Sequence, residues 1–163
     1  MTLKLNFFAK SDRGLIRDNN EDSGYAGPHL LILADGMGGH AAGEVASELM
    51  VNHLEILDQD PGQEDTTALL EAAAEQANEA ISDHVKAHPE TEGMGTTLST
   101  MLFNGTDFGV CHVGDSRGYL LRDGKLKQIT KDDTYVQSLV DKGELDPGDV
   151  SSHPQKSLSL IHI

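Results

Sequence analysis

The sequence contains few residues that can cross-link it or carry positive charge. Cys111 is the only cysteine among 163 residues, so no disulfide can form within the chain, and we interpret it as a small buried residue of a strand. Lysine and arginine together number 12, against 27 aspartate and glutamate residues, and the formal net charge is −15 at pH 7. So acidic a chain offers no basic patch for a nucleic acid or an acidic membrane, and we exclude both as partners.

Long hydrophobic runs and a leader pattern are also missing. No apolar stretch approaches the length that spans a membrane, and the N-terminus lacks the basic and then apolar segments of a signal peptide. We therefore expect a cytoplasmic protein without membrane contact in this segment, and any membrane anchor would lie beyond residue 163. The length predicts one domain with a hydrophobic core, and a hydrophobic content of 37% is ordinary for a globular protein.

Two strands are predicted in the first part of the chain. Leu3–Lys10 alternates weakly between apolar and polar positions, which indicates a strand with one buried face. Leu30–Ala34 is an uninterrupted apolar run that is too short for a buried helix and long enough for a buried strand. We expect the second strand to lie beside the first, which would bring the polar cluster Asp18–Asp22 towards its end.

Two helices are predicted next. Apolar residues recur at helical spacing from Ala41 to Leu57 and again from Thr66 to Val85. Asp65 or Thr66 is the expected N-cap of the second helix, and His88-Pro89 is the expected stop. Because the loop between them is short, the two helices should pack antiparallel on a common surface.

The second half of the chain is predicted to form an antiparallel meander. Asn104-Gly105 and Asp123-Gly124 are strong signals for hairpin turns. The four strands that flank these turns and the polar break between them are Thr96–Phe103, Phe108–Val113, Gly118–Arg122 and Lys125–Thr130. Their order implies an antiparallel sheet with the two helices on one face, and therefore an α+β fold.

Asp35 differs from most carboxylates of the chain. Most of the close-set carboxylates, which include the pair Asp58 and Asp60, are expected to be solvated loop charges. Asp35 instead ends the hydrophobic strand, and the glycines at positions 36, 38 and 39 let the backbone turn and approach a ligand. A carboxylate beside exposed backbone carbonyls suits a hard cation such as Mg²⁺ or Mn²⁺. The alternative is a strand-to-helix turn in which Asp35 only caps the helix.

Five motifs in order resemble the N-terminal part of the metal-dependent protein serine/threonine phosphatases, the type-2C or PPM family, in its bacterial branch. They are Ser11-Asp12-Arg13-Gly14 through Arg17, Asn20-Glu21-Asp22, Ala34-Asp35-Gly36-Met37-Gly38-Gly39, Gly95-Thr96-Thr97 and Gly114-Asp115-Ser116-Arg117. The resemblance implies two antiparallel β-sheets packed as a sandwich and flanked by antiparallel helix pairs. Residues 1–163 would be a single domain of this type that is incomplete at its C-terminus.

The resemblance also implies a metal site with two Mn²⁺ or Mg²⁺ ions and possibly a third. Asp35 would bridge two ions, and Gly36 would lend its backbone carbonyl. Asp115 matches the position linked to the additional, weaker metal site, although its role as a turn residue is nearly as well supported.

Three further residues would surround these ions. Arg17 would bind the phosphate as a catalytic residue, since its planar fork makes bidentate contacts. Its alternative is a surface ion pair with Asp18 or Glu21. Asp22, and to a lesser extent Glu21, would orient metal-bound waters.

The chain departs from the family pattern at two places. Met37 stands where eukaryotic relatives have a histidine proposed as the proton donor, and methionine cannot donate a proton. His40 is a secondary candidate for this role, because it does not occupy the matching position. Further metal-binding aspartates are expected after Ser157, residues 131–157 match the start of a variable flap, and residues 158–163 depart from the pattern. We therefore expect a truncated chain with one side of the metal site.

The leading functional hypothesis is a hydrolase that removes phosphate from phosphoserine and phosphothreonine in proteins and opposes eukaryotic-like Ser/Thr kinases. Its partners would be phosphorylated proteins, including such kinases and their substrates. The first alternative is a catalytically incomplete phosphatase-like fragment or binding module. A nucleotide-binding protein fits poorly, because the glycines at positions 36–43 have neither the P-loop ending nor the dinucleotide spacing.

Overall fold

The computed structural model describes residues 3–39 and 42–133 and divides the chain into two compact units. The first unit extends to His112 and the second begins at Val113, and each is described here by itself. His40 and the predictions for residues beyond 133 lie outside the described residues. Within the described part of the chain, no helix is both long and apolar enough to span a membrane.

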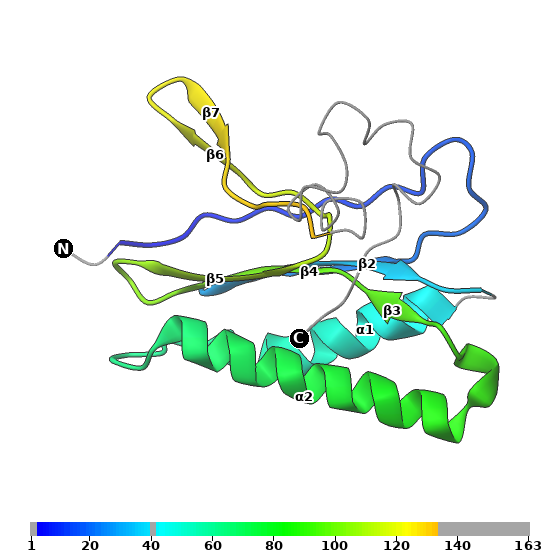
Figure 1. Ribbon diagram of the computed structural model, residues 1–163. Helices are drawn as coiled ribbons and strands as arrows, with labels where there is room; N and C mark the ends of the chain where they lie inside the picture. The colour runs from blue at the N-terminus through cyan, green and yellow to red at the C-terminus, as the bar shows by residue number, and fades with distance from the viewer. Residues whose placement is uncertain (1–2, 40–41, 134–163) are drawn as a thin grey trace, which may run out of the picture. The chain divides into compact units, whose positions relative to one another are not determined.

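The first unit is built on a five-stranded sheet whose main order is β1-β2-β4-β5, with β3 paired to β2 (Figure 1). Strand β2 is central and pairs antiparallel with β1, β3 and β4. The strands are β1 (Asp22–Ala26), β2 (Leu30–Met37), β3 (Gly95–Thr96), β4 (Leu98–Phe103) and β5 (Phe108–Val113). The predicted strand at 30–34 is therefore confirmed. It extends three residues further, to Met37, and so includes Asp35.

Two helices cover one face of this sheet (Figure 1). They are α1 (Ala42–Leu54) and α2 (Thr66–Ala87), followed respectively by the short 3-10 helices η1 (Glu55–Leu57) and η2 (Pro89–Thr91). The side chain of Asp65 caps α2 by accepting hydrogen bonds from the amides of Thr67 and Ala68 at 2.9 and 3.2 Å. The core between the helices and the sheet contains the fully buried leucines Leu30, Leu54, Leu70, Leu98 and Leu102. The two predicted helices and their shared surface are confirmed.

The second unit contains an antiparallel hairpin of β6 (Tyr119–Arg122) and β7 (Lys125–Gln128). Asp123 and Gly124 both have positive φ, at 51° and 72°, as a type I′ turn requires. The turn prediction is confirmed, but the expected meander is wrong. Strands β4 and β5 belong to the five-stranded sheet, whereas β6 and β7 form a two-stranded sheet of their own.

The predicted strand at 3–10 is wrong. Residues 3–21 contain no strand, and within the described residues they pair with none. Alternation alone does not make a strand, because a single extended segment needs a paired neighbour to satisfy its backbone groups. The place beside β2 is taken by β1, whose sequence Asp-Ser-Gly-Tyr-Ala has few strand-forming residues and gave no signal.

Asp58 explains why β1 forms where it does. Its carboxylate accepts hydrogen bonds from the Tyr25 hydroxyl at 2.5 Å and from the amides of His29 and Leu30 at 2.9 and 3.1 Å. A Cβ at Gly27 would overlap the same carboxylate, so a larger residue there would displace Asp58 from its hydrogen bonds. Asp58 is therefore an exception to the expectation that most close-set carboxylates are solvated loop charges: it links the β1–β2 turn to the end of η1.

Candidate metal and phosphate site

The candidate site lies at the end of β2, where two carboxylates are opposed. Asp35 pairs directly with Asp22 across the antiparallel β1–β2 ladder. Ala34 and Gly36, on either side of Asp35, are buried, so the exposed Asp35 side chain projects from the other face of the strand. Directly opposite residues place their Cβ atoms about 5 Å apart, and like charges there repel each other. A cation between the two carboxylates would relieve this repulsion.

The backbone of Asp35 is held on one side by Thr97. The amide of Asp35 donates to the Thr97 hydroxyl at 3.0 Å, and the amide of Thr97 donates back to the Asp35 carbonyl at 2.9 Å. Thr97 lies at the break between β3 and β4, and Thr96 pairs with Gly36. The family resemblance includes the Gly-Thr-Thr motif but implies no role for it. Its role here is to fix the backbone from which the Asp35 carboxylate projects.

Gly36 is held on the other side by Glu21 and the first turn of α1. Its amide donates to the Glu21 carbonyl at 3.1 Å, and a Cβ at position 36 would overlap the carbonyl group of Gly43. Glycine is required here by close approach of two backbones. The Glu21 side chain accepts from Asn19 at 2.9 Å and lies against Gly43. The role of Glu21 in orienting metal-bound water stays a prediction.

The loop before β1 positions Asp22 and carries Arg17. The Asp22 amide donates to the Asn20 side chain at 3.1 Å, and the Asn20 amide group donates to the Ser11 hydroxyl at 2.6 Å. Arg17 is exposed and, within residues 3–39 and 42–133, forms no ion pair with Asp18 or Glu21. The alternative role of Arg17 in a surface ion pair is therefore not found among the described residues.

Asp115 belongs to the second unit, in a turn that is held at both ends. The Gly114 carbonyl accepts from the Asp133 amide at 2.7 Å. Arg117 donates to both oxygens of Asp132, with its shortest contact at 2.6 Å, and this pairing raises the pKa of the guanidinium further above its usual value. Arg117 thus holds the turn in place through Asp132. The structure describes the units separately, so the metal role of Asp115 stays a prediction.

The oxygen ligands of the described residues are of the type that a hard divalent cation prefers, but there are too few of them to complete its coordination. Asp35 and the Gly36 carbonyl are oxygen donors of the kind that Mg²⁺ and Mn²⁺ bind, and Asp22 lies directly opposite Asp35. Within residues 3–39 and 42–133, however, no group of three or more His, Cys, Asp or Glu residues is arranged to hold a metal ion. The described part of the chain therefore presents a partial ligand set.

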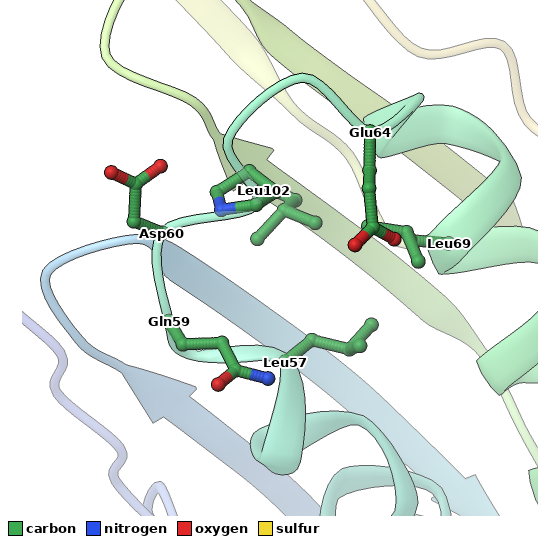
Figure 2. A pocket seen from close by; sticks show the side chains of 7 residues that line it. Leu57, Gln59, Asp60, Glu64, Leu69 and Leu102 are labelled. Atoms are coloured by element: carbon green, nitrogen blue, oxygen red, sulfur yellow. The ribbon is translucent and has the colours of Figure 1, made fainter.

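A separate cavity of about 220 Å³ lies at the opposite end of β2, between the α1–α2 loop and β4. Figure 2 shows Gln59, Asp60 and Glu64 beside leucine side chains that line it. Leu102 of this cavity pairs with Leu30, which is five residues from Asp35, or about 17 Å along the strand. The cavity is thus distinct from the candidate site.

Cys111 is not a reactive residue. Burial of the thiol and the nearby negative charge of Glu71 raise its pKa. The thiol therefore stays protonated and unreactive at neutral pH. This agrees with the interpretation of Cys111 as a packing residue of a strand, here β5.

Comparison with known families settles the class of protein that this fold and site represent. Residues 5–138 match the family described as protein phosphatase 2C. The match covers most of the chain, and the chain belongs to this family. The expected α+β fold with two antiparallel sheets is confirmed.

Individual relatives are bacterial Ser/Thr phosphatases. The chain is 60% identical over 160 residues to the serine/threonine protein phosphatase PstP of Mycobacterium tuberculosis, covering 98% of this chain and 31% of that protein. It is 37% identical to the serine/threonine phosphatase stp of Listeria monocytogenes, covering 93% of this chain and 64% of that one. A crystal structure of the PstP catalytic domain with two manganese ions superposes with a TM-score of 0.83 at 59% identity, over 90% of this chain and 64% of that one. The chain thus spans about a third to two thirds of the length of these relatives.

Proposed function

We propose that this chain provides part of the active site of a protein phosphatase that hydrolyses phosphoserine and phosphothreonine with Mn²⁺ or Mg²⁺. The observation that carries the proposal is the opposed pair of Asp22 and Asp35, with Asp35 and Gly36 held by backbone hydrogen bonds. Two carboxylates that lie directly opposite each other repel, and a cation bound between them would relieve that repulsion. Membership in the family and the likeness to a manganese-bound relative support the choice of ion.

Each residue has a distinct proposed task. Asp35 and the Gly36 carbonyl would hold the metal, and Asp115 would contribute to a further ion. Divalent ions bound in such a site lower the pKa of a bound water, so that hydroxide is present at neutral pH. Asp22 and Glu21 accept hydrogen bonds from water and orient it towards the phosphorus.

Arg17 is the proposed phosphate ligand. Its planar guanidinium can donate two parallel hydrogen bonds to phosphate oxygens and orient the phosphorus for attack. Its exposure and lack of an ion pair with Asp18 or Glu21 support this task. The proton of the leaving serine or threonine cannot come from Met37, and His40 is retained as a candidate donor. Residues 1–163 forming one domain, a cytoplasmic location and an action opposite Ser/Thr kinases are proposed from the family resemblance.

Hydrolysis of p-nitrophenyl phosphate by residues 1–163 tests the proposal directly. Activity that requires Mn²⁺ and is lost in EDTA and in Asp35→Asn, which keeps the shape of the side chain and removes the charge, would support the metal mechanism and show that residues 1–163 suffice. A folded chain without activity would favour the alternative of an incomplete, phosphatase-like binding module. Activity that survives both EDTA and the substitution would exclude the metal mechanism.

A further inference from the structure

Ser47 is a buried hydroxyl that the proposed mechanism does not use. It lies on α1, is 0% exposed, and places its Oγ 2.7 Å from the backbone carbonyl oxygen of Glu21. A longer contact of 3.1 Å leads back to the Glu44 carbonyl in the preceding turn of the helix. Burying a hydroxyl is unfavourable unless it is hydrogen-bonded, so these partners are part of the reason that serine is accommodated here.

The direction of each hydrogen bond follows from the number of protons. Ser47 has one hydroxyl proton, and the shorter contact assigns it to the Glu21 carbonyl, which can only accept. The hydroxyl of Ser23 lies 2.9 Å from that of Ser47 and therefore donates to it. The result is a short relay from Ser23 on β1 through Ser47 on α1 to the Glu21 carbonyl.

The Glu21 carbonyl is the point where this relay meets the candidate metal site. It also accepts the Gly36 amide at 3.1 Å, so both of its lone pairs are used, one by Ser47 and one by Gly36. Added Cβ atoms at Gly36 and Gly43 would each overlap backbone atoms of the other residue or the Glu21 side chain. With so little free space, a displacement of the Glu21 carbonyl must be passed on to Gly36 or Asp22.

We propose that Ser47 is a positioning residue of the metal site, which fixes the Glu21 carbonyl and through it the Gly36 peptide and the spacing of Asp22 and Asp35. Loss of the Ser47 hydroxyl frees one lone pair of a part-buried carbonyl and removes the hydrogen bond between α1 and Glu21, the residue that precedes β1. The inference rests on the proposed function for the identity of the ligand. The hydrogen bonds of Ser47 themselves do not depend on it.

Paramagnetic broadening by Mn²⁺ tests this inference without requiring catalysis. ¹⁵N-labelled chain, residues 1–163, is titrated with Mn²⁺, and the amide signals near Asp35 and Gly36 are followed in the original chain, Ser47→Ala and Ser23→Ala. The matched control Ser23→Ala also removes one hydroxyl, that of the residue which donates to Ser47, and leaves the Ser47–Glu21 hydrogen bond intact. We expect the Mn²⁺ midpoint to rise about fivefold to tenfold in Ser47→Ala, as for loss of one hydrogen bond to a buried group, and less than about twofold in Ser23→Ala.

A second readout separates positioning from general damage. Hydrogen exchange at the Gly36 amide should accelerate in Ser47→Ala, while amides in the distant part of the core, such as that of Leu102, stay protected. If Ser47→Ala does not fold, Ser47→Cys, which keeps the volume and is a weaker donor, takes its place and should raise the midpoint by a smaller factor.

The outcomes distinguish the inference from the proposed function. Local broadening in the original chain with the same midpoint in Ser47→Ala and Ser23→Ala would overturn the inference and leave the metal site standing. Equal weakening by both variants would also overturn it, because the relay rather than Ser47 would then matter. No local broadening in the original chain would overturn the proposed metal site and the inference together.

Discussion

The two ends of β2 use carboxylates in opposite ways. At one end, Asp58 accepts three hydrogen bonds from the β1–β2 turn. At the other end, Asp35 projects from an exposed face directly opposite a second carboxylate, Asp22. The hydrogen bonds around Asp58 use its side chain, whereas the two between Asp35 and Thr97 use the Asp35 backbone. The difference is that Asp58 binds local donors and stabilises the fold, whereas Asp35 has a fixed backbone and an opposed charge, the arrangement that we propose binds a cation.

Removing the Asp58 carboxylate should produce the largest loss of stability. Asp58→Ala leaves the Tyr25 hydroxyl and the amides of His29 and Leu30 without their charged acceptor, and we expect a loss of about 3–5 kcal/mol in the free energy of unfolding. Urea denaturation followed by circular dichroism measures it. Asp60→Ala, at an exposed neighbour, is the control and should change stability by less than about 1 kcal/mol. Equal effects of the two substitutions would contradict the assignment of Asp58 as a structural acceptor.

Gly36→Ala should damage the fold and the site together. The added Cβ would overlap the Gly43 carbonyl, which cannot move without shifting α1, so we expect a loss of about 1–3 kcal/mol. Mn²⁺ binding near Asp35 should weaken at the same time, which denaturation and paramagnetic broadening measure separately. Gly39→Ala, where an added Cβ meets nothing within 4 Å, is the matched control. Unchanged stability in Gly36→Ala would contradict the close packing of the Gly36 and Gly43 backbones.

The hydroxyl of Tyr25 should make stability depend on alkaline pH. The hydrogen bond to Asp58 is the main cause that raises the Tyr25 pKa above its ordinary value of about 10, with burial and the charge of Asp58 adding to it. Because the folded pKa is raised, the stabilisation is fully present below pH 10 and is lost as the pH rises through the folded pKa. Tyr25→Phe should cost about 1 kcal/mol at pH 8 and remove this part of the alkaline loss. Denaturation at pH 8 and above pH 10 checks both, and parallel curves for the two chains would refute the linkage.

Asp35→Asn should have the smallest effect on stability, and in the opposite direction. Removing one of two opposed charges relieves repulsion with Asp22, so we expect a gain of about 0.2–1 kcal/mol in the absence of metal. Mn²⁺ should then no longer stabilise the chain, because a ligand adds stability only by binding the folded state. Thermal unfolding with and without Mn²⁺ measures both effects. A large loss of stability without metal would place Asp35 in the same class as Asp58.

Sequence patterns predicted the elements whose own residues decide their structure. The apolar run at 30–34, the helical stripes, the Asp65 cap and the Asp123-Gly124 turn all carry local signals, and the structure confirms them. Strand β1 carries no such signal, since pairing with β2 and the Tyr25–Asp58 contact determine it. The strand predicted at 3–10 does not form, because a strand also depends on a partner. The segment alternates in sequence but has no paired neighbour among the described residues.

The candidate site shows the same division. Asp35 and Gly36 were predicted because a charge and glycines interrupt an apolar run, which is visible in sequence. Asp22 was singled out from the family motif, and its register opposite Asp35 needed the structure. Thr97 was listed only within a motif, and Ser47 was not singled out, because both act on backbone groups of other residues. No local pattern marks a hydroxyl that binds a distant amide or carbonyl.

The Asp58 contacts also bear on the order in which the chain folds. Its partners at Tyr25, His29 and Leu30 are 28 to 33 residues away, and the intervening chain contains β1, β2, α1 and η1. These contacts join the β1–β2 hairpin to the end of η1, which follows α1. They need no strand from the second half of the chain. Closing the loop between Tyr25 and Asp58 costs less conformational entropy than pairing β4 with β2, because β4 begins 40 residues after Asp58. We therefore expect residues 22–58 to form the folding nucleus, with Asp58→Ala slowing folding more than it speeds unfolding.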